Sequence, residues 1–232
     1  MKKALLVALA GLWGFVTPVL PAHAATLTGA WEMNEASGAT TMVDSSGHGY
    51  NGTIGTGITV GGGIYTWPFR SPTAPPADKQ RLALIGHRDA LNPGTGYYAV
   101  EFRYRTTQHF GNIIQKGQGG ASGGYFKIEN PAGNIECKFR GKKADGTWAA
   151  KVAKSPTVLS DGQWHTILCE RSSTSLKLYV DGALVVTKNG TTGNIVNTRP
   201  ISIAGKLNCN NLPGGTTCDY FTGSLDYVRI YK

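Results

Sequence analysis

Hydrophobic and polar residues alternate with a period of two along most of the chain. Apolar and charged residues take turns in segments 100–105 and 137–142, and one apolar face is formed by Leu176, Leu178 and Val180. Because successive side chains of a strand point to opposite faces of a sheet, this alternation predicts half-buried β-strands. Beyond the N-terminal apolar run, no segment shows the helical period of about 3.6 residues.

Turn signals separate the alternating segments. Asp-Gly or Asn-Gly pairs occur at residues 145–146, 161–162, 181–182 and 189–190, and such pairs are typical of tight hairpin turns. The predicted strands recur about every ten residues, which is typical of a β-sandwich. We therefore expect an all-β fold built from two antiparallel sheets.

The N-terminus has the features of a signal peptide. A short basic start precedes an apolar run at residues 4–16, and residues 22–24 give the small-x-small pattern of a signal peptidase site. The run is shorter than the roughly 20 apolar residues that a membrane-spanning helix needs. We predict a signal peptide at residues 1–24, cleavage after Ala24, and one secreted domain at residues 25–232.

The charge of the chain favours anionic partners. The sequence has 23 Lys and Arg against 14 Asp and Glu, and removal of Lys2 and Lys3 leaves 21 against 14, a balance of +7. Acidic polysaccharides, wall polymers, membrane surfaces and nucleic acid are all attracted by such a charge. The chain has no nucleic-acid recognition motif and no second long apolar run, so we expect neither nucleic acid nor stable membrane insertion. Solubility alone is the alternative meaning of the charge.

Four cysteines remain after the signal peptide, an even number that indicates two disulfides in an exported protein. Of the three possible connectivities we favour Cys137–Cys169 and Cys209–Cys218. The first pair would join two strands through core-facing positions, and the second would close a loop rich in Gly, Asn and Pro. Metal ligation is the rival, but no Cys-x-x-Cys spacing is present.

Several segments occur in the order typical of one protein family, and they lie at residues 31–38, 44–47, 161–165, 176–182 and 221–232. From about Leu27 to Lys232 the chain resembles the laminin-G-like domains of the concanavalin A-like lectin and glucanase superfamily. The resemblance implies a two-sheet antiparallel jelly-roll β-sandwich. It also implies a class of function, namely recognition of a glycan or a protein, and in some members catalysis.

The glycosidases of that superfamily carry Glu-x-Asp-x-x-Glu on one strand, and this chain contains no Glu-x-Asp at all. Glu32 and Glu35 are three residues apart, and an odd spacing on a strand sends two side chains to opposite faces. Residues 120–124 match Gly-x-Ser-x-Gly, but they lie in a Gly-rich hairpin loop and not in the strand–turn–helix that a nucleophile elbow needs.

Jelly-roll polysaccharide lyases are the second enzyme class considered. They neutralise a uronate carboxylate with Arg, Gln or Asn and use Tyr or His as base and acid. Segments 101–105, 114–115 and 125–127 are loosely similar to their motifs, but the Arg-x-Glu-x-Arg order is absent and no His follows Gln115 at the expected spacing. A lyase or hydrolase stays an alternative, and we assign no catalytic residue.

A structural Ca²⁺ ion is a candidate cofactor. Asp226 lies in a segment that is similar to the last strand of many jelly-roll glucanases and carbohydrate-binding modules, in which the matching Asp often ligates Ca²⁺. Asp44 would supply a further oxygen, and calcium takes six to eight oxygen ligands. In the alternative interpretation Asp226 caps a bulge and Asp44 initiates a turn.

The candidate ligand-binding residues combine positive charge with aromatic rings. Three cations alternate along segment 137–142 and should project from one face of a strand, with a loop tryptophan nearby. Aromatic faces and a few polar groups are typical of sugar sites. The predicted set is Trp67, Tyr125, Lys138, Arg140, Lys142 and Trp148.

These observations together favour a secreted, non-catalytic, lectin-like module that binds a polysaccharide or glycoconjugate and prefers acidic polymers. A solvated outer strand face is the alternative for the basic residues. A protein-binding adhesion or envelope module is the alternative for the whole domain.

Overall fold

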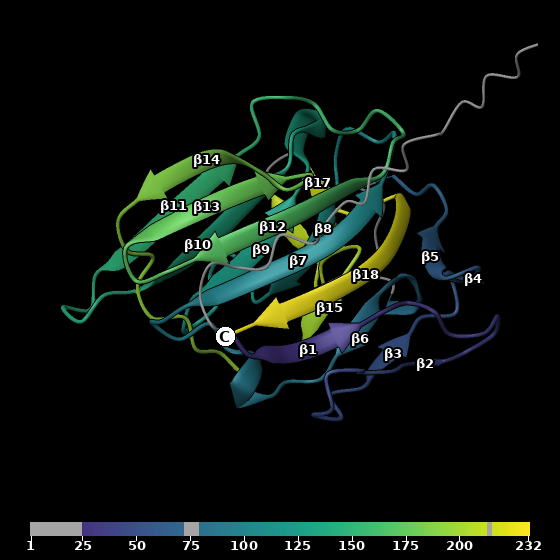
Figure 1. Cartoon of the computed structure of the whole chain (residues 1–232), viewed down its shortest axis with the longest axis horizontal. Helices are drawn as coiled ribbons and strands as arrows, with labels where there is room; N and C mark the ends of the chain where they lie inside the picture. The colour runs from purple at the N-terminus through teal and green to yellow at the C-terminus, as the bar shows by residue number, and fades with distance from the viewer. Residues whose placement is uncertain (1–24, 72–78, 213–214) are drawn as a thin grey trace, which may run out of the picture.

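A computed structural model describes residues 25–71, 79–212 and 215–232, and the expected signal peptide lies outside them. Two antiparallel sheets of eight strands each face one another as a β-sandwich (Figure 1). The expected all-β, two-sheet architecture is therefore confirmed. Three short 3₁₀ helices occur in the described connections: η1 (Lys79–Arg81), η2 (Asp89–Leu91) and η3 (Pro131–Gly133).

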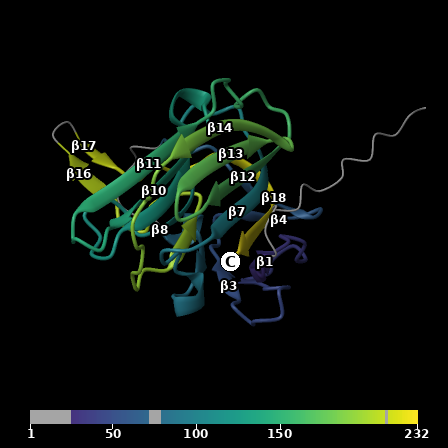
Figure 2. The same cartoon turned by 60° about the vertical axis from the view of Figure 1, so that its left-hand side comes forward.

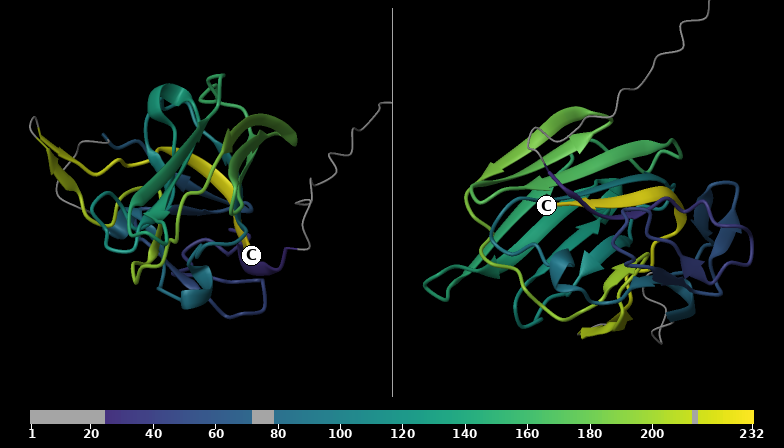
Figure 3. Two further views of the ribbon diagram at one scale, coloured as in Figure 1. Left: turned by 90° about the vertical axis from the view of Figure 1, so that its left-hand side faces the viewer. Right: turned by 60° about the horizontal axis from the view of Figure 1, so that its bottom comes forward.

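Sheet 1 has the order β14-β13-β12-β7-β18-β5-β4, and β1 pairs with β18 outside this path. Its strands are β1 (Leu27–Trp31), β4 (Thr59–Gly61), β5 (Ile64–Trp67), β7 (Tyr98–Arg105), β12 (His165–Arg171), β13 (Ser175–Val180), β14 (Ala183–Asn189) and β18 (Gly223–Tyr231). Because β18 pairs with β1, the C-terminal strand lies beside the first strand of the domain (Figure 3).

Sheet 2 has the order β11-β10-β9-β8-β15-β6-β3-β2. Its strands are β2 (Thr41–Met42), β3 (Gly52–Ile54), β6 (Ala83–Ile85), β8 (Asn112–Lys116), β9 (Tyr125–Glu129), β10 (Glu136–Lys142), β11 (Trp148–Lys154) and β15 (Ile201–Ile203). The chain leaves sheet 1 after β14 and reaches sheet 2 at β15 through the connection 190–200. This connection borders the candidate site.

The core lies between the sheets and consists of the inward side chains of each alternating strand. Along β7 the core residues include Phe102 and Tyr104, and along β10 they include Phe139. Cys137 of β10 and Cys169 of β12 are both fully buried and form a disulfide that links the two sheets, with their Cα atoms 6.0 Å apart. The disulfide predicted from core-facing positions is confirmed.

The second predicted disulfide is confirmed as well. Cys209 and Cys218 are joined, with Cα atoms 4.2 Å apart, around a small hairpin of β16 (Asn210–Leu212) and β17 (Gly215–Thr217). This hairpin projects from the body of the sandwich (Figure 2). The disulfide ties the two ends of the hairpin together, and the fully buried Cys218 packs with Leu82 and Tyr220 in a small second core.

Candidate functional site

The outer face of sheet 2 carries the basic residues that the alternation predicted. Along β10, Lys138 and Arg140 are half-buried and Lys142 is exposed, whereas Cys137 and Phe139 point into the core. Side chains two residues apart on a strand share a face. The three cations therefore form one row on the surface of the sandwich.

Trp148 of β11 lies in register with Lys142 on this face, and 39% of its surface is exposed. The Arg140 guanidinium carbon is 4.2 Å from the centre of the indole ring, and the Lys142 ammonium nitrogen is 5.4 Å from it. Cations are attracted to the negative face of an indole. Within the part of the chain that the structure describes, Lys138, Arg140 and Lys142 form no ion pair with a carboxylate. Their positive charge is therefore available to an anionic ligand.

Tyr125 continues this surface on β9, where it lies in register with Arg140. Only 7% of Tyr125 is exposed, so this side chain offers little contact area to a ligand. Lys127, two residues further along β9, forms ion pairs with Glu129 and, at 3.7 Å, with Asp219. The charge of Lys127 is balanced by these carboxylates, so Lys127 adds no free positive charge to the row on β10. We call the row Tyr125, Lys138, Arg140, Lys142 and Trp148 the cationic strip.

Trp67 lies elsewhere in the molecule, and it belongs to the core. It ends β5 of sheet 1, is 1% exposed, and its indole N–H donates to the carbonyl oxygen of Arg81 at 2.9 Å. Its ring packs edge-on against Phe221 with centroids 6.2 Å apart. A surface ligand does not reach this ring, so Trp67 is left out of the candidate site.

A pocket of about 200 Å³ opens on the same outer face of sheet 2, at the end of β8. Its floor includes Gln115 and Ser202, and one side is the Gly-rich hairpin loop 117–121 between β8 and β9. The opposite side is formed by segments 199–200 and 207–208. The pocket and the cationic strip thus share one sheet face.

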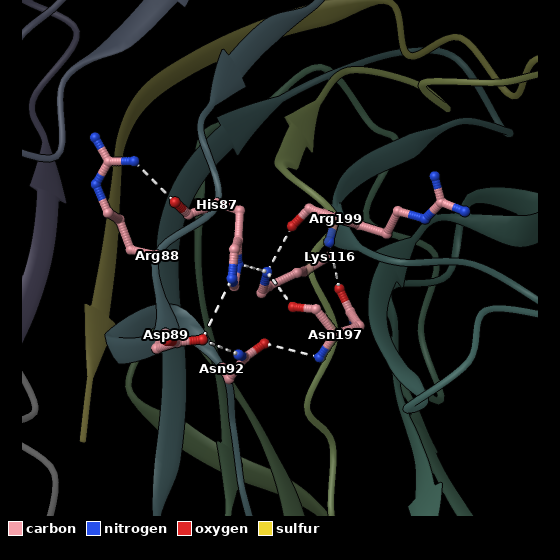
Figure 4. A network of polar contacts seen from close by, with 7 residues as sticks. All are labelled: His87, Arg88, Asp89, Asn92, Lys116, Asn197 and Arg199. Atoms are coloured by element: carbon pink, nitrogen blue, oxygen red, sulfur yellow. Dashed lines mark hydrogen bonds and ion pairs between the residues drawn. The ribbon is translucent and has the colours of Figure 1, made fainter.

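The wall at residues 199–200 is held by a buried lysine, Lys116 of β8 (Figure 4). The Lys116 ammonium donates to His87 Nδ1 at 3.1 Å and to the carbonyl oxygens of Asn197 at 3.1 Å and Arg199 at 2.5 Å. Burial lowers the pKa of Lys116 to about 8, and the nearby Asp89 carboxylate opposes this change only in part. The three acceptors use all three ammonium protons, so the lysine acts as a fixed brace for the connection 190–200.

The same connection is fixed from its other side by a chain of polar contacts (Figure 4). Because His87 Nδ1 accepts from the lysine, its proton is on Nε2, which lies 3.3 Å from Asp89 Oδ1. Asn92 Oδ1 accepts from the backbone N–H of Asn197 at 3.1 Å, and Asn197 Nδ2 donates to the carbonyl oxygen of Gly124 at 2.9 Å. The Gly-rich loop and the connection are thus tied together around the pocket.

A second buried cation, Arg171, holds the start of the connection 190–200 in place. Residues 191, 193 and 194 of this connection border a hollow of about 460 Å³ that lies beside Lys142 and Lys143. The fully buried Arg171 donates to Thr192 Oγ1 (2.8 Å) and to the carbonyl oxygens of Pro93 (3.1 Å), Gly94 (3.0 Å) and Gly193 (2.6 Å). Burial lowers the pKa of Arg171 to about 10, which leaves it charged at neutral pH.

Sequence reasoning missed Lys116, Arg171 and Arg199 as builders of this site. Lys116 and Arg171 each end a strand and bind mainly backbone carbonyl groups, which every residue type carries. The one signal in the sequence is the charge of Lys116, which closes a strand whose two preceding isoleucines are buried. Arg199 enters the site only because the connection folds back over sheet 2.

The two predicted calcium ligands are held by separate partners. Asp44 accepts backbone N–H groups of Ala30 (2.9 Å), Ser46 (3.0 Å) and Tyr50 (2.9 Å). Burial alone would raise the pKa of Asp44, but the hydrogen bonds from Ser46, Ala30 and Tyr50 outweigh it and lower this pKa below its usual value. Both oxygens of Asp44 thus organise a turn.

Asp226 lies at the bulge of β18 and pairs with Arg103 at 2.7 Å. Among the described residues, no group of three or more His, Cys, Asp and Glu has the arrangement of a metal site. These contacts do not fit one calcium ion shared by Asp44 and Asp226. Calcium binding stays a prediction that finds no support in the geometry.

The three segments that loosely resemble lyase motifs do not meet. Arg103 and Arg105 lie on β7 in sheet 1, whereas Gln115 and Tyr125 lie on β8 and β9 in sheet 2. These side chains alternate with core residues on their strands, so they face outward on opposite sides of the sandwich. The arrangement does not assemble a uronate clamp with a nearby tyrosine base.

Comparison with known families agrees with this architecture. A laminin G domain model, described as concanavalin A-like lectin/glucanases superfamily, matches residues 85–232, which is more than half of the chain. The chain belongs to the concanavalin A-like lectin/glucanase superfamily. A comparison with curated protein sequences gives no match.

Solved structures that resemble this chain include a laminin fragment and two binding domains. The mouse laminin α1 chain, domains LG4–5, is 18% identical over 64% of this chain and 38% of its own, with a TM-score of 0.49. The binding domain of Paraclostridial Mosquitocidal Protein 1 is 14% identical over 89% and 48%, with a TM-score of 0.57. The botulinum neurotoxin serotype G binding domain is 12% identical over 88% and 46%, with a TM-score of 0.58.

This chain therefore spans less than half the length of each of these structures, and identities this low show a shared fold alone. Within the described residues, no helix has both the length and the apolar character needed to cross a membrane. The two disulfides indicate an extracellular, oxidising environment.

Proposed function

We propose that this protein is a secreted, non-catalytic glycan-binding module that prefers acidic polysaccharides and binds them along the cationic strip of sheet 2. The observation that carries the proposal is the exposed Trp148 ring, which is flanked by Arg140 and Lys142 at 4.2 and 5.4 Å while neither cation is neutralised by a described carboxylate. An aromatic face suits the apolar face of a sugar ring, and the cations suit its carboxylate or sulfate groups.

The wider context supports the same interpretation. Two of the structures with a similar fold are described as binding domains, so the scaffold is used for recognition in other proteins. The two disulfides and the signal-peptide pattern of residues 1–24 support export into a medium where extracellular polymers are found. Fold alone does not assign a ligand, so the argument rests on the strip.

A second tryptophan with two cations lies on the opposite side of the sandwich and provides a matched control. The guanidinium carbons of Arg103 and Arg105 are 5.0 and 4.9 Å from the centre of the Trp164 ring. There, however, Arg103 is paired with Asp226 at 2.7 Å. The charge on that face is partly neutralised, which is why we place the site at Trp148.

The test is affinity electrophoresis of the oxidised protein through gels that contain heparin, polygalacturonate, dextran or hydroxyethylcellulose, at physiological salt. We expect retardation by at least one of the two acidic polymers and weaker or no retardation by the neutral ones. Trp148→Ala should weaken binding by about tenfold or more, the loss typical of a central aromatic contact, while Trp164→Ala leaves it unchanged. Absence of retardation by both acidic polymers, or loss of binding only in Trp164→Ala, would overturn the proposal.

A further inference from the structure

The pocket beside loop 117–121 lies three strands from Trp148 on the same face of sheet 2. Gln115 on its floor belongs to β8, and Trp148 belongs to β11, with β9 and β10 between them. Neighbouring strands are about 4.8 Å apart, so three spacings make about 14 Å across the sheet. Through β9 and β10, Gln115 is in register with Val152, and Trp148 lies four residues before Val152, which adds about 13 Å along the strand. A single sugar ring does not span this distance, whereas a short oligosaccharide does.

The surface between the two places is continuous. Gly117, at the start of the loop, has a φ of 76°, and a Cβ atom there would lie 3.1 Å from Tyr125 Cβ and 3.0 Å from Asn197 Nδ2. The loop backbone therefore lies directly against Tyr125, and Tyr125 is in register with Arg140 of the cationic strip. No projecting side chain at position 117 separates the pocket from the strip.

The pocket offers hydrogen-bond donors and one free cation. Gln115 Oε1 accepts from Asn112 Nδ2 at 2.6 Å, which leaves the Gln115 amide N–H groups to donate into the pocket. Ser202 Oγ donates to the carbonyl oxygen of Gly205 at 2.9 Å, so its own lone pairs can accept from a ligand hydroxyl.

The Arg199 side chain is exposed, extends away from the Lys116 network (Figure 4), and makes no ion pair with any described carboxylate. A guanidinium and amide donors around a volume of about 200 Å³ match one sugar residue that carries a carboxylate or sulfate group.

The wall that presents Arg199 is rigid before any ligand arrives. Its backbone carbonyl oxygen accepts from the buried Lys116, and its backbone N–H donates to Asn197 Oδ1 at 2.9 Å. Because the wall is already ordered, less conformational entropy is lost when a ligand binds. The Arg199 side chain takes no part in these bonds, so it can be changed without disturbing them.

We propose that this pocket is a second subsite for the same polysaccharide, and that the subsite binds an acidic sugar residue through Arg199 and Gln115. The protein therefore recognises oligosaccharides and not single sugars. This inference rests on the proposed function, because the first subsite is the cationic strip at Trp148. The ligand then runs obliquely across β11, β10, β9 and β8.

The experiment is isothermal titration calorimetry of the wild-type protein, Trp148→Ala, Arg199→Gln and Arg88→Gln. Each protein is titrated with two series of probes, oligogalacturonates and heparin-derived oligosaccharides, from disaccharide to octasaccharide. Arg88→Gln is the matched control, since Arg88 is also exposed, loses the same charge and does not line the pocket. Its guanidinium lies over the Tyr50 ring and donates to the backbone carbonyl oxygen of His87, so the His87 side chain that accepts from Lys116 is not touched. In the wild type we expect affinity to rise with length between disaccharide and octasaccharide in at least one series.

Arg199→Gln should reduce octasaccharide affinity by about tenfold, as loss of a charged hydrogen bond does, and leave disaccharide affinity unchanged. Arg88→Gln should differ from wild type by less than about twofold. If octasaccharides bind, depend on Trp148, and bind Arg199→Gln and wild type equally, the second subsite is overturned and the proposed function stands. If neither series binds the wild type, both proposals are overturned.

Discussion

Removal of the inter-sheet disulfide should destabilise the protein more than removal of the hairpin disulfide. Cys137–Cys169 joins the two sheets with a sequence separation of 32, and Cys209–Cys218 closes a separation of 9. The chain-entropy model assigns about 3.7 kcal/mol to the longer loop and about 2.6 kcal/mol to the shorter loop at 25 °C. We expect the measured difference to exceed this value of about 1 kcal/mol. Both cysteines of the inter-sheet pair are fully buried whereas Cys209 of the hairpin pair is only partly buried, so removal of the inter-sheet pair leaves the larger cavity.

The assay is equilibrium unfolding in urea of wild type and two double variants, Cys137→Ala with Cys169→Ala and Cys209→Ala with Cys218→Ala. Urea slopes are compared as well as midpoints, since an uncrosslinked chain exposes more surface on unfolding. We expect the first variant to lose about 4 kcal/mol or more and the second about 2.6 kcal/mol. Equal losses, or a larger loss in the hairpin variant, would refute the assignment of the inter-sheet disulfide as the main covalent restraint.

Three further predictions concern the buried polar groups. Arg171→Met should cost about 3–5 kcal/mol in urea unfolding, because three carbonyl groups lose their donor; a loss below about 1 kcal/mol would contradict the brace. The pKa of Lys116 is about 8 in the folded protein and about 10.4 when unfolded, so the unfolded chain binds more protons between these values and folding gains stability as pH rises. The free energy of unfolding of wild type relative to Lys116→Met should therefore increase by about 2 kcal/mol from pH 7 to 9.5, and a flat difference would contradict burial of the ammonium. Asp44→Ala should lower the free energy of unfolding by about 2 kcal/mol or more at pH 7. Because the pKa of Asp44 is lowered in the folded protein, this loss should shrink as pH falls through that pKa. A melting temperature of wild type that rises on adding Ca²⁺ would contradict the assignment of Asp44 to the turn.

The fold and the strip were accessible from the sequence because both depend on side-chain alternation. A one-residue shift on a strand changes the face, so Cys137 and Phe139 place Lys138, Arg140 and Lys142 outside with little ambiguity. The preferred disulfide pairing used the same alternation for Cys137 and Cys169, which face the core, and loop composition for Cys209 and Cys218.

Trp67 shows that the alternation of side chains along a strand also applies to the last residue of the strand. Tyr65 and Trp67 are two residues apart and alternate with Ile64 and Thr66, which predicts that both aromatic rings face the same side. In the structure that side is the core. The prediction of Trp67 as a ligand-binding residue is therefore wrong, because its ring faces the core and not the surface.

The pocket was not accessible from the sequence because its walls come from segments far apart in the chain. Loop 117–121 meets residues 199–200 and 207–208 only after the connection 190–200 crosses the end of the sandwich. This crossing is held by Lys116 and Arg171, which bind backbone carbonyl oxygens. Every residue type has a backbone carbonyl, so these contacts cannot be predicted from the sequence.

The central claim is that an acidic glycan binds the outer face of sheet 2, and the most direct measurement is backbone amide chemical-shift mapping by NMR during titration with the heparin-derived octasaccharide or the octagalacturonate. The account predicts that the shifted amides lie on β9, β10, β11 and loop 117–121, with the side-chain indole N–H of Trp148 among them and that of Trp164 unchanged. Shifts gathered instead on β7, β12 and β18 of sheet 1, or no shift with either probe, would contradict it.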